Sequence, residues 1–182
     1  VRAPLRMAQA TISDFVTSKQ AWIEKSQQKM AARSKKLATR EFRSGETFLY
    51  QGAALPLHLT VRRTPPLELT STGWLLSASA LGRAEAAFEA WYRRRARTEF
   101  TNVLDVFSAK MRVQYQSLRI SSARTRWGSC STLGTISLNW RLLLAPPEIL
   151  EYVAVHELAH LRQRNHSKAF WAEVAAFHPQ YA

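Results

Sequence analysis

Apolar residues recur at spacings of three and four along the middle and the end of the chain, which predicts three helices there. The longest pattern runs from Ala84 to about Met111 and places its apolar side chains on one face. A second pattern runs from about Glu148 to Arg162 and opens on Pro146-Pro147, because proline suits the first helical turn. Ser167 is the predicted N-cap of a last helix that contains Phe170, Trp171 and Val174.

Alternating apolar residues and turn signals predict strands between the helices. The upstream strands are Thr47 to Tyr50 and Leu55 to Val61, joined through Gln51-Gly52, and a hairpin of Leu67–Leu69 with Trp74–Leu76 around Ser71-Thr72-Gly73. Pro65-Pro66 separates the two pairs, in an edge or loop position. Downstream we expect one strand over Gln114 to Cys130, a turn at Ser131 to Gly134 and a returning strand over Thr135 to Asn139.

The first segment, Thr11 to Lys36, predicts another helix with Ser13 as its N-cap. Beyond Lys25 this segment turns polar and basic, which indicates an exposed end or a linker. Together the elements predict an α+β protein with two regions. Residues 1–82 hold an N-terminal helix and a β-rich part, and residues 83–182 hold a second domain with a small mixed or antiparallel sheet packed on a long helix.

Composition narrows the class of protein. The 182 residues are 46% hydrophobic, enough for one core, and no apolar run approaches the roughly 20 residues that a membrane helix needs. No signal peptide is evident, and the single cysteine, Cys130, excludes an internal disulfide and fits a reducing compartment, so we expect a cytoplasmic protein. The chain opens on Val1 rather than Met, so we expect N-terminal sequence to be missing.

The net charge of +13, from 26 Lys and Arg against 13 Asp and Glu, is the strongest compositional deviation. Such a surplus attracts polyanions, including nucleic acid, but equally describes a solvated basic surface. Four arginines within the long helix (Arg93, Arg94, Arg95 and Arg97) allow the same two explanations, and we favour the solvated face.

Candidate chemistry is concentrated in His156-Glu157-Leu158-Ala159-His160, an HExxH motif within a predicted helix. Four residues advance a helix by about 400°, so the two imidazoles share one face and can bind one zinc ion. Glu157 follows the first ligand and can accept a proton from a water on the metal. The helix is apolar around the motif, and buried polar groups need partners, which a metal supplies.

A catalytic zinc needs a third protein ligand, and His166 is the first candidate. Its spacing from His160 is that of the metzincins, although Gln163 stands where a metzincin has glycine. Asn165 offers another way to turn the chain, because Asn tolerates the left-handed conformation. The alternative third ligands, in order, are Glu173 on the following predicted helix and His178 further along the chain. His58 lies in a predicted strand far upstream and is expected at the surface.

Several stretches together resemble the YgjP-like metallopeptidase family, which is related to the SprT and WLM zinc peptidases. They include Arg124 to Cys130, Ser137-Leu138-Asn139, Tyr152 to Leu161, Asn165-His166-Ser167 and Phe170-Trp171. The resemblance implies a zincin-like α+β fold with one zinc held by His156, His160 and His166 and with Glu157 as the base. It also implies that a β-hairpin normally precedes Val1.

In zincins an edge strand beside the cleft pairs with the extended substrate. The segment Trp127-Gly128-Ser129 is expected to be that strand or its neighbour, with Gly128 allowing close backbone approach. For Trp127 and Cys130 themselves, core packing is the favoured explanation over substrate contact.

These observations predict a zinc metalloendopeptidase in which Glu157 assists the attack of a zinc-bound water on a peptide bond of a peptide or protein substrate. One alternative keeps the metal but hydrolyses the phosphoanhydride of a nucleotide, which the positive charge would suit. Another is a basic nucleic-acid-binding module with a structural metal. A combination of both activities, by analogy with SprT and WLM relatives, is held more weakly.

Overall fold

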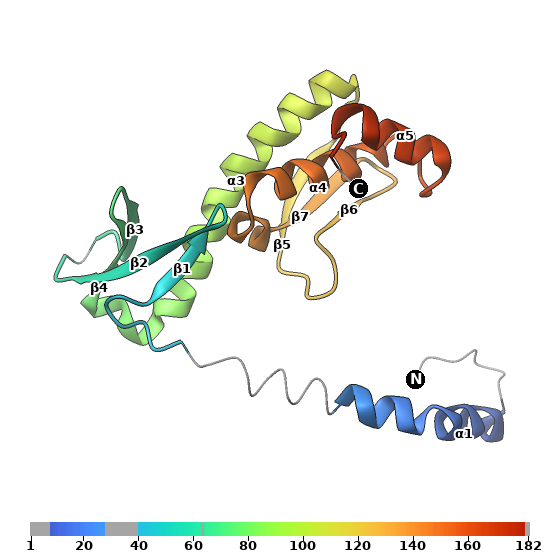
Figure 1. The fold of residues 1–182 in the computed structure, drawn as a ribbon, viewed down its shortest axis with the longest axis horizontal. Coiled ribbons are helices and arrows are strands. Elements are labelled where there is room, and N and C mark those ends of the chain that lie inside the picture. The colour runs from blue at the N-terminus through green and yellow to red at the C-terminus, as the bar shows by residue number, and fades with distance from the viewer. Residues whose placement is uncertain (1–7, 28–39, 63, 181–182) are drawn as a thin grey trace. The chain divides into compact units, whose positions relative to one another are not determined.

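The computed structural model describes residues 8–27, 40–62 and 64–180. Contacts within the chain divide it into two units, residues 1–41 and residues 42–182 (Figure 1). The predicted boundary between residues 82 and 83 lies inside the second unit and remains a prediction.

The first unit contains α1 (Gln9–Ser18), after which residues 20–27 are again helical. The predicted N-cap Ser13 is wrong, because the helix already begins at Gln9, after Ala8. Gln9 and Ala10 are good helix formers, so the helix extends past the serine. No side chain of α1 is buried, and Phe15 is 58% exposed. Positions 28–36 of the predicted helix lie outside the described residues.

The second unit opens with a four-stranded sheet in the order β1-β2-β4-β3. Its strands are β1 (Thr47–Tyr50), β2 (Ala53–Thr60), β3 (Leu67–Thr70) and β4 (Gly73–Ser77). Gln51 and Gly52 both have positive φ, as a two-residue hairpin turn requires, and join β1 to β2 antiparallel. β2 pairs with β4 in parallel, whereas β3 and β4 form the second predicted hairpin.

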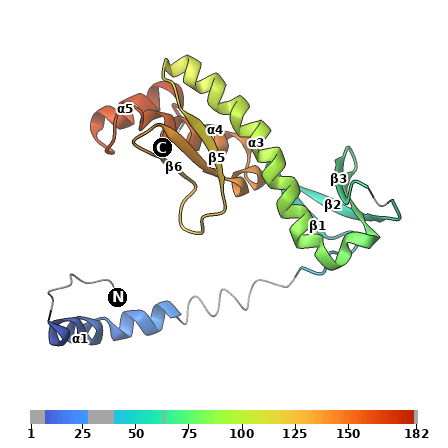
Figure 2. The ribbon, with the colours of Figure 1, turned by 180° about the vertical axis from the view of Figure 1, so that it is seen from behind.

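A short 3₁₀ helix, η1 (Ala78–Arg83), leads into α3 (Ala84–Met111), which has the predicted bounds. Buried residues recur along one face of α3 at Ala84, Phe88, Tyr92, Ala96, Phe100, Leu104, Phe107 and Met111. The N-terminal part packs on the four-stranded sheet, where the Phe88 ring stacks on Phe48 at 4.2 Å. Figure 2 shows that α3 continues beyond this sheet to the three-stranded sheet described below.

The four arginines of α3 divide into two pairs. Arg93 donates to the Ser122 hydroxyl at 2.6 Å. Arg95 donates to the Tyr50 hydroxyl of β1 at 3.1 Å, besides its ion pair at 2.7 Å with Glu99 of α3 itself. Arg94 and Arg97 are exposed. The favoured description as a solvated face therefore applies to the second pair, while the first pair ties the helix to its neighbours.

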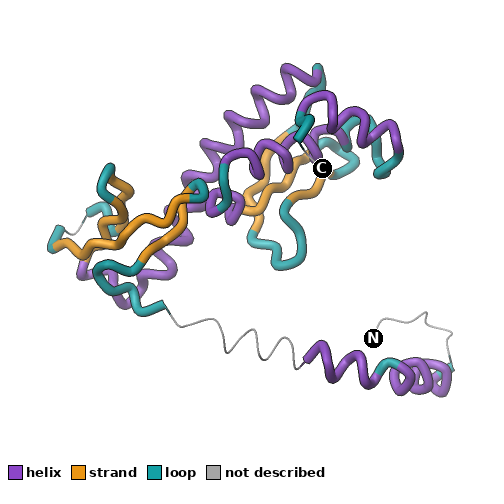
Figure 3. Tube along the Cα trace, in the orientation of Figure 1, coloured by secondary structure: helices purple, strands orange, loops and turns teal. Residues whose placement is uncertain are grey.

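A three-stranded sheet in the order β5-β7-β6 packs beside α3 (Figure 3). It consists of β5 (Ser117–Ser121), β6 (Gly128–Cys130) and β7 (Thr135–Asn139), with β5 parallel and β6 antiparallel to β7. The 3₁₀ helix η2 (Trp140–Leu144) follows, and then α4 (Pro147–Ala159) and α5 (Lys168–Phe177).

The single strand predicted over Gln114 to Cys130 is wrong, because two strands, β5 and β6, occupy that range with a loop between them. The two strands lie on opposite sides of β7. Asn139, which is 3% exposed, holds the loop by donating to the backbone carbonyls of Ala123 and Arg126 at 2.7 and 3.3 Å. These two hydrogen bonds come from a residue far along the chain, which local sequence does not reveal.

The α+β class is confirmed, with a small mixed sheet packed on the long helix and on the helix that carries the HExxH motif. α4 ends at Ala159, three residues before the predicted end, because the amides of Leu161 and Arg162 bond to carbonyls three residues back. Among the helices of the described ranges, none combines the length and the apolarity needed to cross a membrane.

Candidate metal centre

Three imidazoles meet at the C-terminal end of α4. His156 and His160 lie one turn apart, with ring centroids separated by 5.0 Å, and His166 comes from the segment between α4 and α5. The His166 ring lies 5.0 Å from that of His156 and 4.8 Å from that of His160. One nitrogen from each ring can be chosen so that all lie within 4.8 Å of one another. The structure therefore brings together the three predicted ligands.

Phe170 supports the three rings. Its centroid lies 4.9, 4.6 and 4.7 Å from those of His156, His160 and His166. Phe170 is fully buried in the first turns of α5, a helix whose N-cap, Ser167, accepts a hydrogen bond from the Phe170 amide as predicted. The sequence predicted Phe170 only as a residue of the last helix, and the fold shows that its ring packs against the base of the histidine cluster.

Two arginines hold the segment that carries His166. Arg164 donates to the backbone carbonyls of Ser131 and Thr132 at 3.0 Å each, which attaches the segment to the turn between β6 and β7. Arg162 donates to the carbonyls of Met111 and Arg112 and pairs with Glu173 at 2.8 Å. These bonds were not anticipated from the sequence, because arginines in a polar segment carry no local signal of their partners.

The contact of His160 with Gln163 selects the tautomer of its neutral ring. Its Nδ1 lies 3.0 Å from the Gln163 backbone carbonyl. A carbonyl oxygen only accepts hydrogen bonds, so Nδ1 carries the proton and the lone pair lies on Nε2. Metal-binding histidines are commonly oriented in this way. Gln163, the residue that departs from the metzincin pattern, thus contributes through its backbone.

The cluster fits a divalent metal. Zinc–nitrogen bonds of about 2.0–2.1 Å in a tetrahedron put two ligand nitrogens about 3.3 Å apart. The Nε2 atoms of His156 and His166 are 3.1 Å apart. Burial, with a smaller contribution from the neighbouring histidines, lowers the pKa of His156 to about 4, so its ring is neutral and able to bind a metal at pH 7.

Glu157 lies on the same turn of α4 and is 6% exposed. Burial raises the pKa of its carboxyl from 4.5 to about 7. A carboxyl with a pKa near the working pH is suited to accept and return a proton.

Gly128 in β6 lies directly against Glu157. A Cβ at this glycine would come within 2.7 Å of the Glu157 Cγ and 2.8 Å of its Cδ, closer than real Cβ contacts allow. The close neighbour of Gly128 in the structure is thus the Glu157 side chain, whereas the approach of a substrate to this strand stays a prediction. The lack of a side chain at position 128 makes room for the carboxyl beside the imidazoles.

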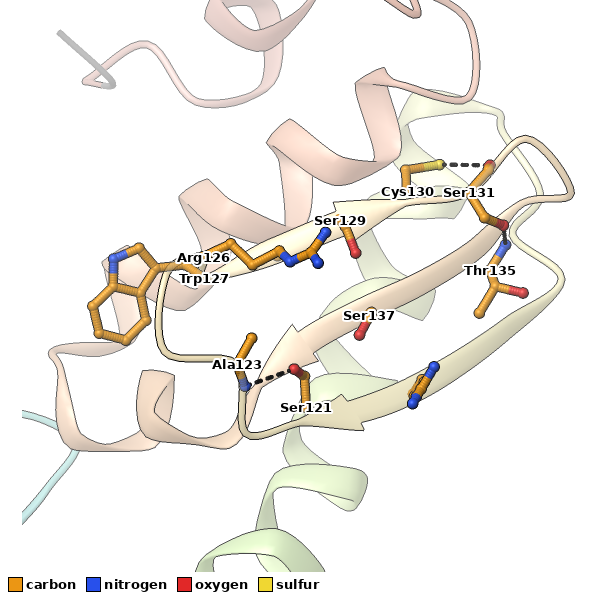
Figure 4. A pocket seen from close by; sticks show the side chains of 11 residues that line it. Ser121, Ala123, Arg126, Trp127, Ser129, Cys130, Ser131, Thr135 and Ser137 are labelled. Atoms are coloured by element: carbon orange, nitrogen blue, oxygen red, sulfur yellow. Dashed lines mark hydrogen bonds between the residues drawn. The ribbon is translucent and has the colours of Figure 1, made fainter. Parts of the chain in front are cut away.

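The neighbours of Gly128 differ in exposure. Trp127 is 57% exposed, so the expectation that it packs in the core is wrong, because it belongs to the loop rather than to a continuous strand. Ser129 and Cys130 are half-buried, and burial raises the pKa of the Cys130 thiol. Figure 4 shows the Trp127 side chain and the Ser129 hydroxyl in the lining of one hollow beside β6.

The alternative ligands lie apart from the cluster. Glu173 forms the ion pair with Arg162, and its exposure is 12%. His178 caps α5 and packs its ring 5.7 Å from Tyr152, while His58 is exposed on β2, as expected.

The solved structures that this chain is similar to include two archaeal metallopeptidase zymogens. Abylysin of Pyrococcus abyssi is 30% identical, with a TM-score of 0.39 over 42% of this chain and 76% of that one. Jannalysin of Methanocaldococcus jannaschii is 20% identical, with a TM-score of 0.40, and the match covers 43% of this chain and 80% of jannalysin. No curated protein matches the chain. The family described as YgjP-like, metallopeptidase domain, matches residues 1–182, so this chain belongs to the YgjP-like metallopeptidase family.

Proposed function

We propose that this metallopeptidase is a zinc-dependent endopeptidase, with His156, His160 and His166 as the zinc ligands and Glu157 as the general base. One observation carries the proposal. Three imidazoles with nitrogens within 4.8 Å of one another stand beside a buried carboxyl whose pKa is about 7. Three neutral histidines are a common ligand set for catalytic zinc and leave one position open.

Zinc bound here would supply Lewis-acid chemistry, since it polarises a carbonyl oxygen and lowers the pKa of water. Glu157 accepts the proton of the attacking water and returns it to the nitrogen of the leaving amine. The Gln163 carbonyl keeps the His160 ring in the tautomer that binds metal through Nε2. Phe170 excludes water from the back of the cluster.

The substrate in this proposal is an extended stretch of a peptide or protein. β6 is the outer strand of its sheet and pairs only with β7 among the described strands. A peptide can add to such an edge through main-chain hydrogen bonds. Because Gly128 of β6 touches Glu157, a peptide on this edge passes beside the base. The single cysteine suits the reducing cytoplasm, the compartment that the proposal assumes.

The test begins with metal content, measured by mass spectrometry on wild type, His166→Ala and Glu157→Gln. The proposal expects about one zinc per chain in wild type and Glu157→Gln and a loss in His166→Ala. A second assay measures cleavage of a denatured protein substrate. The proposal expects zinc-loaded wild type to cleave it and Glu157→Gln to do so at least a hundredfold more slowly. Hydrolysis of nucleoside triphosphates without peptide cleavage would refute the peptidase proposal and favour the phosphohydrolase.

A further inference from the structure

The three-stranded sheet has an outer face directed away from α4. Side chains alternate along a strand, and position 128 points at Glu157, so Ser129 points to the opposite face. There a hollow of about 440 Å³ lies over the sheet (Figure 4). Its lining combines the arginines Arg119 and Arg126 with a set of hydroxyl side chains, namely Ser121, Ser129, Ser131, Thr135 and Ser137.

The hollow is positively charged. None of the residues that line it is Asp or Glu. Within the described part of the chain, neither Arg119 nor Arg126 lies at ion-pairing distance from a carboxylate, unlike Arg95 and Arg162, which have Glu99 and Glu173. Two arginines without a counter-charge, among hydroxyl donors, favour an anionic ligand group.

The hollow adjoins the free edge of β6. The Asn139 amide donates to the Trp127 carbonyl at 2.8 Å, and the Ser131 amide donates to the Thr135 carbonyl at 3.0 Å. Hydrogen-bonding groups alternate between the two sides of an antiparallel strand, so those of Gly128 and Cys130 face the free edge. A chain added there would place the residue opposite Ser129 on the outer face, over the hollow.

Figure 4 shows the Arg126 side chain extending along β6 toward Ser129. We propose that Arg126, supported by Arg119 across the sheet, binds an Asp or Glu side chain of the substrate at the position opposite Ser129. The site then selects protein segments with an acidic residue there. This inference rests on the proposed function for the placement of the peptide on β6.

A carboxylate suits the hollow better than a nucleic acid does. Single-stranded nucleic acid needs a groove with successive aromatic platforms, and Trp127 is the one aromatic side chain in this lining. One exposed carboxylate–arginine pair changes affinity by up to about fivefold, and a second arginine adds to the attraction.

The test measures binding, so that it does not depend on cleavage. Two fluorescent ten-residue peptides carry either Glu or Gln at alternate positions and are otherwise identical. Fluorescence anisotropy reports their affinity for the zinc-loaded Glu157→Gln variant of the whole 182-residue chain. Arg126→Gln is introduced into this background, with Arg94→Gln as the matched control, because Arg94 is an exposed arginine of α3 outside the hollow. A single-stranded oligonucleotide of equal charge serves as the competitor.

We expect the Glu peptide to bind about fivefold more tightly than the Gln peptide. The ratio of the two affinities should fall to near one in Arg126→Gln and stay unchanged in Arg94→Gln. Equal binding of the two peptides, or a preference that Arg126→Gln leaves intact, overturns the inference. So does an oligonucleotide that binds the hollow more tightly than the Glu peptide. If the Arg126-dependent preference is present but wild type cleaves no peptide, the inference stands and the proposed peptidase activity fails.

Discussion

At the scale of single residues, Glu157 combines deep burial with a carboxyl whose pKa lies near neutral pH. Its pKa of about 7 in the fold lies above the 4.5 of an unfolded chain. Between these values the folded state holds a proton that the unfolded state has released. The metal-free protein therefore loses stability as the pH rises from about 4.5 to 7. Above pH 7 it carries the whole destabilisation that the buried, ionised Glu157 carboxylate causes.

The first prediction concerns Glu157→Gln. At pH 8 the free energy of unfolding of the metal-free variant should be about 1–3 kcal/mol larger than that of metal-free wild type. This difference in stability should shrink toward zero at pH 4.5. Urea unfolding in the presence of a chelator measures it. Protonation of His156 below pH 6.5 destabilises both proteins alike and cancels in the difference. Glu148→Gln, an exposed carboxylate on the same helix, is the control, and an equal gain there would contradict the explanation by burial.

At the scale of elements, the contact between β6 and α4 sets the position of the base. The second prediction is that Gly128→Ala displaces the Glu157 carboxyl, because the new Cβ overlaps it. The peptidase rate should fall by roughly 10–100-fold while zinc content stays near that of wild type. Gly82→Ala is the matched control, since a Cβ there meets nothing within 4 Å. Full activity in Gly128→Ala would show that Glu157 can move without loss.

The segment between α4 and α5 gives the third prediction. Arg164→Gln removes both hydrogen bonds to the turn between β6 and β7 and so loosens the segment that carries His166. Zinc affinity, measured by competition with a chromophoric chelator, should weaken by about tenfold. Lys168→Gln removes an exposed charge at the start of α5 and should leave the affinity unchanged. Equal weakening in both variants would point to net charge instead.

At the scale of the whole molecule, contacts separate residues 1–41 from residues 42–182. The fourth prediction is that a chain lacking residues 1–39 keeps its melting temperature within about 2 °C and keeps its zinc content. Removing residues 1–43 also removes Phe42, whose ring stacks at 5.4 Å on Phe48 and lies 5.8 Å from Phe88. That longer deletion should lower the melting temperature by several degrees. A large loss in the shorter deletion would mean that the first unit supports the second.

Local patterns determined much of this architecture. The bounds of α3, the Gln51-Gly52 hairpin, the Ser167 cap and the helical spacing of His156 and His160 each depend on residues close together in the chain. Such features follow from backbone geometry and side-chain periodicity, so the sequence alone predicts them. His166 was a candidate for the same reason, because it follows the motif at a known ligand spacing.

Only the tertiary structure decided what depends on residues far apart. Asn139 divides the predicted strand by binding the loop before β6, Gly128 meets Glu157, and Phe170 supports the histidine rings. The position of Arg126 over the open sheet face belongs to the same group. Each contact joins segments whose own composition is compatible with several partners. Their meeting is set by how the sheet and helices pack, because packing and hydrogen bonding must be satisfied across the whole fold at once.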